Sequence, residues 1–255
     1  MRGFGGFAQP ATLVGHRGLG AGTVGGHDQN TLPSFLAALD AGIGWVEVDV
    51  GMTGDGELFV AHDAYVKAAF LSQVTGEQAS RWGLLRIDEL LEALPAAAGV
   101  VFDVKSALED AGRSPTSTTA AVLARGLRQA VQQRPVIALS FDPASLHHMR
   151  AETPGLPLGL LTWTHFPVGH AVAAAAHLDV QLLALHAGSL WPSDETAPED
   201  IPALMEVVAA VHRADRQLLA WCPTPEQALT LAAANVDALV VDDVAHQVDA
   251  LRSLV

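Results

Sequence analysis

Short apolar segments alternate with amphipathic segments along almost the whole chain, and this alternation restricts the fold more than any other feature of the sequence. The apolar segments have the length and the Val and Leu content of buried strands. The amphipathic segments repeat apolar residues at helical spacing. Strands are predicted over residues 12–15, 46–50, 100–105, 136–140, 158–162, 180–185, 217–221 and 237–241. Helices are predicted over residues 32–41, 87–94, 118–132, 143–151, 168–177, 201–213, 225–233 and 244–254.

About eight strand–helix units with short connections are typical of parallel βα repeats. Within 255 residues, this number favours a closed α/β barrel of the (β/α)8 or TIM type. An open doubly wound sheet is the alternative, but such a sheet usually has fewer strands and a phosphate-binding glycine turn, which this sequence lacks. Because no linker divides the chain, residues 1–255 are expected to form a single domain.

The segment 45–63 carries the most distinctive polar pattern. Val46, Val48 and Val50 alternate with Glu47 and Asp49, which is the period of an extended strand. Side chains two residues apart point to the same face, so the two carboxylates lie together. Like charges at that distance repel unless a cation or hydrogen-bond donors separate them. The alternative is a solvated strand face with a charged pair, which is common on edge strands.

In a barrel of this type the active site lies at the carboxyl ends of the strands. The polar residues expected at these ends are His16, Arg17, Glu47, Asp49, His62, Asp103 and Lys105, with Trp221 at the end of the seventh strand. The three carboxylates suit one divalent cation, Mg²⁺ or Ca²⁺. The two histidines suit a general acid and a general base, and the two basic side chains suit a phosphate group. Together these residues predict metal-assisted cleavage of a phosphodiester.

The sequence also resembles the glycerophosphodiester phosphodiesterase family. The resemblance is carried by residues 16–18 (HRG), 30–35 (NTLPSF), 46–50 (VEVDV), 55–56 (DG), 62–63 (HD), 102–105 (FDVK) and 140–143 (SFDP), and by Trp221, 236–237 (VD) and Asp242. It covers nearly the whole chain in the order of the family, and it implies a TIM barrel.

The resemblance implies a role for each matched residue. His16 and His62 would be the acid–base pair, and Glu47 and Asp49 metal ligands. Arg17 and Lys105 would contact the phosphate group. The family reaction splits a glycerophosphodiester into an alcohol and sn-glycerol 3-phosphate, with a cyclic phosphate as the usual proposed intermediate. The departures from the family include Gln29 in place of a glutamate and Asp103 in place of the glutamate that is usually the third metal ligand. They also include the segment 221–224 (WCPT), which in the family normally reads WTVN.

Two other functions remain open at this point. One keeps the site but acts on a lipid phosphodiester, as a lysophospholipase D or a sphingomyelinase D does. It predicts an apolar groove at the barrel mouth, for which Phe70, Leu71, Trp82, Phe166 and Trp191 are the candidates. The other is a barrel that binds a phosphorylated ligand without turnover, but such a protein has little need of two acid–base groups. Trp221 is expected to line the substrate pocket.

Composition excludes several partners. The net charge of −14 argues against nucleic acid, because phosphate backbones require basic surface. The sequence has no uninterrupted apolar run of about 18 residues, so no stable membrane insertion is expected. The single cysteine, Cys222, cannot form an internal disulfide, and the first ten residues lack the apolar run of a signal peptide. These features predict a cytoplasmic protein with a small-molecule substrate, and they leave the oligomeric state open.

Overall fold

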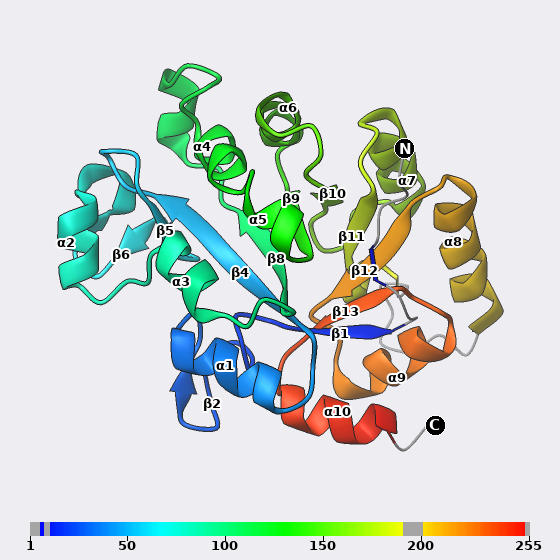
Figure 1. Ribbon diagram of the computed structural model, residues 1–255. Coiled ribbons are helices and arrows are strands. Elements are labelled where there is room, and N and C mark those ends of the chain that lie inside the picture. The colour runs from blue at the N-terminus through cyan, green and yellow to red at the C-terminus, as the bar shows by residue number, and fades with distance from the viewer. Residues whose placement is uncertain (1–5, 8–10, 191–200, 253–255) are drawn as a thin grey trace.

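The structure is a computed structural model that describes residues 6–7, 11–190 and 201–252. Eight parallel strands form a closed ring, in which β1 pairs with both β13 and β4 (Figure 1). The strands of the ring are β1 (Thr12–Gly15), β4 (Trp45–Met52), β8 (Gly99–Val104), β9 (Val136–Ser140), β10 (Leu158–Leu161), β11 (Leu182–His186), β12 (Gln217–Trp221) and β13 (Ala238–Val241). This ring confirms the predicted (β/α)8 barrel. The extent of the domain over residues 1–255 stays a prediction.

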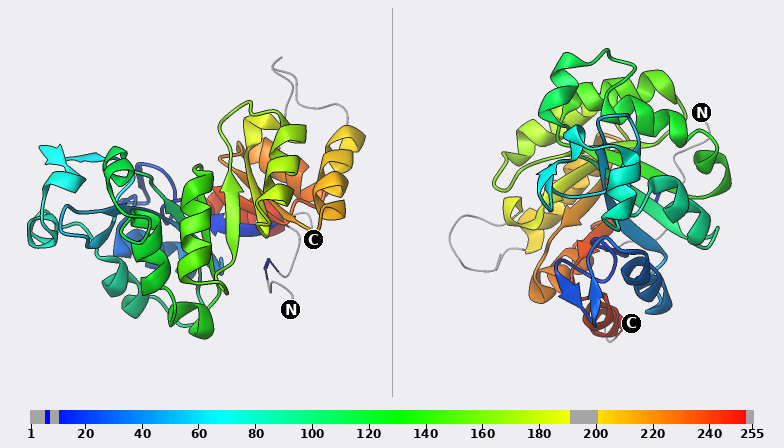
Figure 2. Two further views of the ribbon diagram at one scale, coloured as in Figure 1. Left: turned by 90° about the horizontal axis from the view of Figure 1, so that it is seen from above. Right: turned by 90° about the vertical axis from the view of Figure 1, so that its left-hand side faces the viewer.

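Helices cover the outside of the ring (Figures 1 and 2). They are α1 (Leu32–Asp40), α3 (Ile87–Ala93), α4 (Thr119–Gly126), α5 (Ala130–Gln133), α6 (Pro143–Glu152), α7 (Val168–His177), α8 (Ile201–Arg213), α9 (Pro225–Ala233) and α10 (Val244–Arg252). Side-chain oxygens of Thr31, Thr118, Asp142 and Thr224 cap the first turns of α1, α4, α6 and α9. These caps explain where the helices begin. The last residues of the helix predicted over 244–254 lie outside the described residues.

The two faces of each strand belong to different cores. On β4, Val46, Val48 and Val50 pack in the layer between strands and helices. Trp45 lies on the opposite face and packs against the cluster that fills the barrel interior. Strand periodicity therefore places Glu47 and Asp49 on the interior face, above Trp45 toward the carboxyl mouth. The indole of Trp45 packs directly on the backbone of Gly99 in β8, where an added Cβ would lie 2.2 Å from the ring.

The segment after β4 returns the chain to the barrel mouth. The turn at residues 53–56 leads into β5 (Leu58–Val60), which pairs antiparallel to the carboxyl half of β4. The amide of Ala61 donates to the carbonyl oxygen of Asp49 at 3.0 Å. Because the chain folds back in this register, His62 comes to the same end of the barrel as the carboxylates. The predicted turn and extended segment are thus confirmed.

The main differences from the sequence-based expectation lie in three connections and one helix. Residues 64–86, expected as a loop with one helical turn, contain a hairpin of β6 (Tyr65–Val66) and β7 (Ala69–Phe70), a 3-10 turn η1 (Leu71–Gln73) and α2 (Gly76–Arg81). These elements lie outside the ring, at the left of Figure 1. They are too short to show periodicity, and they pack in a small core of their own. A 3-10 turn, η2 (Leu108–Gly112), interrupts the expected loop at 106–115.

The other two differences have simple causes. The helix predicted over 118–132 breaks into α4 and α5 after Gly126, a poor helix former. The glycine-rich stretch before α1 forms a hairpin of β2 (Thr23–Val24) and β3 (His27–Asp28). Its turn residues Gly25 and Gly26 have φ of 59° and 82°, the left-handed conformation that the tightest hairpin turn requires at both positions.

Candidate active site

Three buried carboxylates lie at the carboxyl mouth of the barrel. Strands β4 and β8 pair in a register that sets Asp49 beside Asp103, and Glu47 lies on the same face two residues before Asp49. One oxygen from each of the three side chains lies within 4.8 Å of the others. Their exposed fractions are 5%, 1% and 8% for Glu47, Asp49 and Asp103. The three carboxylates were predicted from the sequence to lie together, and they do so in the structure.

Cationic groups and amides surround Asp49. Arg17 Nε lies 3.0 Å from Asp49 Oδ2, and Lys105 Nζ lies 2.9 Å from Asp49 Oδ1 and also contacts Asp103. Asn30 Nδ2 donates to Asp49 Oδ2 at 2.8 Å. In addition, Arg17 donates from NH1 to Gln29 Oε1 at 3.0 Å, so the amide at position 29 still supplies an acceptor. The two residues predicted to bind phosphate thus line the pocket while paired with a carboxylate.

The carboxylates differ in the energetics of their charged forms. Burial, with the nearby charges of Asp49 and Asp103, raises the pKa of Glu47 well above its usual range. Burial also raises the pKa of Asp103, although Lys105 opposes it. For Asp49, burial acts upward, but the ion pairs with Lys105 and Arg17 outweigh it and lower the pKa. The neighbouring side chains therefore compensate the charged forms of Glu47 and Asp103 less well than that of Asp49.

This donor set fits a hard divalent cation. All three side chains offer oxygen, which is the ligand atom that Mg²⁺ and Ca²⁺ prefer. Asp103 Oδ1 is buried and has no hydrogen-bond partner in the part of the chain that the structure describes. An unpartnered buried oxygen is costly, and a cation between the carboxylates would satisfy it. Asp103 is one methylene shorter than the family glutamate, yet it reaches the cluster.

Two histidines flank the carboxylates, and each is held by an aspartate. His16 follows β1, and its Nδ1 lies 2.9 Å from Asp242 Oδ1. The side chain of His16 is 12% exposed. His62 follows β5, its Nδ1 lies 2.8 Å from Asp63 Oδ1, and 38% of its side chain is exposed. With Nδ1 against a carboxylate, Nε2 of each imidazole makes no hydrogen bond to the residues that the structure describes and is available to exchange a proton with a substrate.

These residues open into one cavity of about 640 Å³. Its lining includes every predicted site residue, together with Met52, Leu71, Ser140, Phe141 and Trp163. Phe141 and Trp163 stack with ring centroids 4.1 Å apart, and Trp163 is 65% exposed. They form an aromatic wall of the cavity, and neither residue was among the site residues predicted from the sequence. Its only sequence signal is the position of both residues just after β9 and β10.

The groove predicted for a lipid chain is only partly present. Leu71 lines the cavity, whereas Trp82 packs against the small core beside β5 and Phe166 against the main core. Phe70 is 45% exposed and pairs edge-on with Tyr65. Trp191 lies outside the described residues. The wall of Phe141 and Trp163 stands where the groove was expected.

Trp221, which was predicted to line the substrate pocket, lines this cavity. Its ring meets Phe141 edge-on at 5.9 Å and His186 at 4.5 Å. Its Nε1 is buried without a hydrogen-bond partner among the described residues. Because an indole N–H is a donor only, this group has an unmet need for an acceptor from a bound molecule.

Cys222 lies at the same end of the barrel, with Sγ 3.8 Å from His16 Nδ1. Burial, reinforced by the charge of Asp242, raises the pKa of its thiol to about 12. A thiol with that pKa is protonated at neutral pH and is a weak nucleophile. The contact with His16 therefore does not form a cysteine–histidine pair for covalent catalysis.

A closed parallel barrel that gathers buried carboxylates, histidines and basic side chains at its carboxyl mouth is the architecture of a (β/α)8-barrel enzyme. Its chemistry is further defined by comparison with known families. The chain belongs to the glycerophosphoryl diester phosphodiesterase family, whose sequence profile matches residues 16–246. The resemblance seen in the motifs is thereby confirmed. None of the curated proteins compared matches the sequence.

Solved structures share the fold over nearly the full chain. A candidate glycerophosphoryl diester phosphodiesterase from Silicibacter pomeroyi DSS-3 is 22% identical, with a TM-score of 0.76 over 97% of this chain and 95% of that one. A phosphodiesterase from Oleispira antarctica, solved in complex with the product sn-glycerol-3-phosphate, is 21% identical, with a TM-score of 0.76 over 95% and 97%. A glycerophosphodiester phosphodiesterase from Thermotoga maritima is 17% identical, with a TM-score of 0.72 over 94% and 97%.

Within the described residues, the helices are too short or too polar to span a bilayer.

Proposed function

We propose that this protein hydrolyses glycerophosphodiesters to an alcohol and sn-glycerol 3-phosphate, with His16 and His62 as the acid–base pair. One observation carries the proposal. Both histidines, each held at Nδ1 by an aspartate, line the cavity that also contains the three buried carboxylates. Family membership and the product complex of the Oleispira antarctica relative support the same reaction.

The two histidines would exchange roles between two steps. In the first, one takes the proton of the substrate glycerol hydroxyl beside the phosphate, and that oxygen bonds to phosphorus. The other donates a proton to the alcohol oxygen as its bond to phosphorus breaks, leaving a cyclic phosphate. In the second, the histidine that is now neutral takes a proton from water, whose oxygen attacks phosphorus. The protonated histidine returns its proton to the departing glycerol oxygen.

Positive charge at the mouth would complete the site. Glu47, Asp49 and Asp103 would hold one divalent cation, Mg²⁺ or Ca²⁺, which when bound supplies charge that stabilises phosphoryl oxygens. Arg17 and Lys105 line the cavity and would bind the phosphate, Arg17 through a guanidinium fork and Lys105 as a point charge. Trp221 would donate its buried N–H to a substrate oxygen.

The test is release of sn-glycerol 3-phosphate from glycerophosphocholine, with Mg²⁺, Ca²⁺ or a chelator. We expect metal-dependent release that His16→Ala and His62→Ala each reduce by about 100-fold or more, as loss of an acid–base group does. His147→Ala is the matched control, because His147 is an exposed residue of α6 outside the cavity. Full activity of both site variants would contradict the proposal. Metal binding without turnover on any phosphodiester would indicate a ligand-binding barrel instead.

A lipid phosphodiester is the second candidate substrate. The observation that favours it is the apolar part of the cavity lining, with Met52, Leu71 and the stacked Phe141–Trp163 pair. Lysophosphatidylcholine is the discriminating substrate. Cleavage of this lipid with glycerophosphocholine left intact would reassign the protein to lysophospholipase D-like or sphingomyelinase D-like activity. Loss of lipid cleavage in Trp163→Ala would then place the acyl chain against Trp163.

The proposed setting is the cytoplasm, with a small molecule as the partner. A single cysteine is compatible with a reducing compartment, and the net charge of −14 disfavours nucleic acid. Localisation of a tagged protein in its native cell would test the first point.

A further inference from the structure

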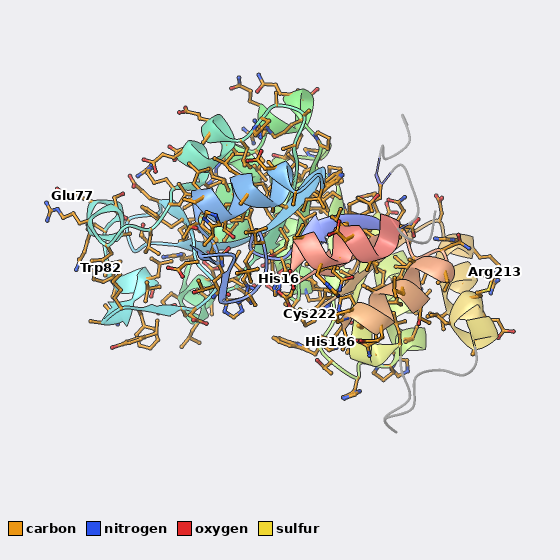
Figure 3. All side chains as sticks on the ribbon, turned by 90° about the horizontal axis from the view of Figure 1, so that it is seen from below. His16, Glu77, Trp82, His186, Arg213 and Cys222 are labelled. Carbon is orange, nitrogen blue, oxygen red and sulfur yellow. The ribbon has the colours of Figure 1, made fainter. Side chains whose placement is uncertain are left out.

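In each of three adjacent strands, the residue that directly follows the strand has a side chain that can bind a metal ion. His16 follows β1, Cys222 follows β12 and Asp242 follows β13. Strand β13 pairs with both β1 and β12. The backbone ladder continues past the strands, because the amides of His16 and Cys222 donate to Val241 and Val240 at 3.0 Å each. The barrel therefore brings the three side chains together at one point of its mouth. Figure 3 shows His16 and Cys222 near the centre of the molecule, far from Glu77 and Arg213 at its two edges.

The distances within this group match a tetrahedral zinc site. His16 Nδ1 lies 2.9 Å from Asp242 Oδ1 and 3.8 Å from Cys222 Sγ, and the three donor atoms lie within 4.8 Å of one another. Zinc binds nitrogen and oxygen at about 2.0 Å and thiolate sulfur at about 2.3 Å, which sets neighbouring tetrahedral ligands roughly 3.3–3.6 Å apart. Small side-chain movements would bring all three atoms onto one ion.

The donor types select the metal. On metal binding the Cys222 thiol would release its proton to solvent. The resulting thiolate, with an imidazole and a carboxylate, forms a mixed set that suits Zn²⁺ far better than Mg²⁺ or Ca²⁺, which prefer oxygen. The second group, Glu47, Asp49 and Asp103, offers oxygen only. The two groups therefore differ in the cation that they would hold. The amide of Ala21, which donates to Asp242 Oδ1 at 2.6 Å, would orient the carboxylate from outside the metal shell.

We propose that His16, Cys222 and Asp242 form an inhibitory zinc site that, when filled, switches off the histidine of the proposed reaction. A metal on Nδ1 replaces the contact between His16 and Asp242 and leaves the remaining imidazole proton on Nε2. His16 then has no free nitrogen lone pair and cannot accept a substrate proton. The inhibitory consequence rests on the proposed function, whereas the site itself rests on the geometry alone.

Cobalt spectroscopy tests the site without any assay of activity. Co²⁺ takes the place of zinc in such sites, and a Co²⁺–thiolate bond gives a charge-transfer band in the near ultraviolet. Cys222 is the single cysteine of the chain, so a thiolate band must arise from it. We expect the band to saturate at one Co²⁺ per tag-free protein, to vanish on addition of one equivalent of Zn²⁺, and to be absent from Cys222→Ser. Its absence from the wild-type protein would overturn the site.

Inhibition of the phosphodiesterase activity by Zn²⁺ tests whether the filled site switches off His16. We expect micromolar Zn²⁺ to inhibit the wild-type enzyme in excess Mg²⁺, and Cys222→Ser to require at least about 10-fold more Zn²⁺, because even the loss of an outer partner costs about 10- to 100-fold in affinity. Asp242→Asn should behave likewise, and the matched control Asp243→Asn, which changes an exposed neighbour by the same charge, should retain inhibition. Equal inhibition of Cys222→Ser would show that the inhibitory zinc binds elsewhere and would overturn the switch. If the wild-type protein shows no phosphodiesterase activity, the proposed function fails, and the cobalt band still decides the site.

Discussion

Glu47 is the residue at which the requirements of folding and of cation binding conflict most. It is buried beside Asp49 and Asp103, and its interactions include one hydrogen bond, from the Arg17 amide to Oε2 at 3.0 Å. In metal-free protein its charge is poorly compensated. We expect Glu47→Gln to raise the free energy of unfolding in chelator by about 1 kcal/mol or more, which is roughly 2–4 °C in unfolding temperature for a domain of this size. The measurement is thermal unfolding with and without EDTA.

The control for this change is Glu77→Gln, at an exposed residue of α2 paired with Arg81 on the surface. A surface ion pair contributes about 0–1 kcal/mol, so the control should change little. A lower unfolding temperature for Glu47→Gln in chelator would mean that the charged form of Glu47 is stabilised in the metal-free fold.

Trp221 tests whether a single unpartnered donor binds substrate. Trp221→Phe keeps an aromatic ring against Phe141 and removes the buried N–H. We expect KM for glycerophosphocholine to rise about 3- to 10-fold with kcat nearly unchanged, since a neutral hydrogen bond contributes about 1 kcal/mol. Steady-state kinetics measure the two constants separately. An unchanged KM would show that the indole N–H does not contact substrate.

At the scale of elements, Asp142 determines where α6 begins. Its carboxylate accepts from the amides of Ala144 and Ser145 at 2.9 and 3.1 Å. Burial acts to raise its pKa, but the Ser145 hydroxyl and these two amides outweigh burial, and the pKa is lowered. We expect Asp142→Ala to lower the free energy of unfolding by about 1 kcal/mol at pH 7. Urea unfolding at several pH values measures this.

The sign of the pH effect follows from the lowered pKa. The folded protein holds the Asp142 proton less tightly than the unfolded chain, so its stabilisation is fully present above the unfolded pKa of about 4. It is lost as the pH falls through the lower folded value. The difference between wild type and Asp142→Ala should therefore shrink below about pH 4. Asp142→Asn, which retains a capping oxygen, should cost less at pH 7; an equal cost would show that charge rather than capping matters.

Gly99 determines how closely β4 and β8 approach at the foot of the barrel. Gly99→Ala would place a methyl group 2.2 Å from the indole of Trp45. We expect a loss of about 1–3 kcal/mol from overpacking. Gly126→Ala is the matched control: the same change is made in α4 where nothing lies within 4 Å, and it should stabilise by up to about 1 kcal/mol. Chemical denaturation compares the two, and a neutral Gly99→Ala would mean that Trp45 repacks freely.

For the whole molecule, a bound cation should stabilise the closed barrel. The three carboxylates come from two strands that pair only in the folded ring, so the unfolded chain cannot present them together. At 100 times its dissociation constant, a ligand adds about 2.7 kcal/mol, or roughly 5–10 °C for a domain of this size. We expect Mg²⁺ or Ca²⁺ to raise the unfolding temperature of wild type in calorimetry. A shift of the same size in Asp103→Asn would place the cation elsewhere.

The sequence alone determined the barrel and the members of the cluster of carboxylates and histidines. The strand–helix alternation is a local property, set by side-chain periodicity, and β4 and β8 show it clearly. The rule that parallel strands present their carboxyl ends at one mouth then placed His16, Glu47 and Asp103 together without knowledge of their contacts. Short elements such as β6 and β7 escaped prediction because two residues carry no period and depend on packing against neighbours.

The tertiary structure decided the partners of these residues, because those partners are distant in sequence and adjacent only in the ring. Asp242 reaches His16 across 226 positions, and Cys222 reaches it across 206. The pairing of β13 with both β1 and β12 makes both contacts. The pairing of β4 with β1 and β8 set Arg17 and Lys105 against Asp49, and the pairing of β9 with β10 brought Trp163 onto Phe141 as an aromatic wall. Local sequence selects strands and helices, whereas the alignment of neighbouring strand ends selects which side chains meet.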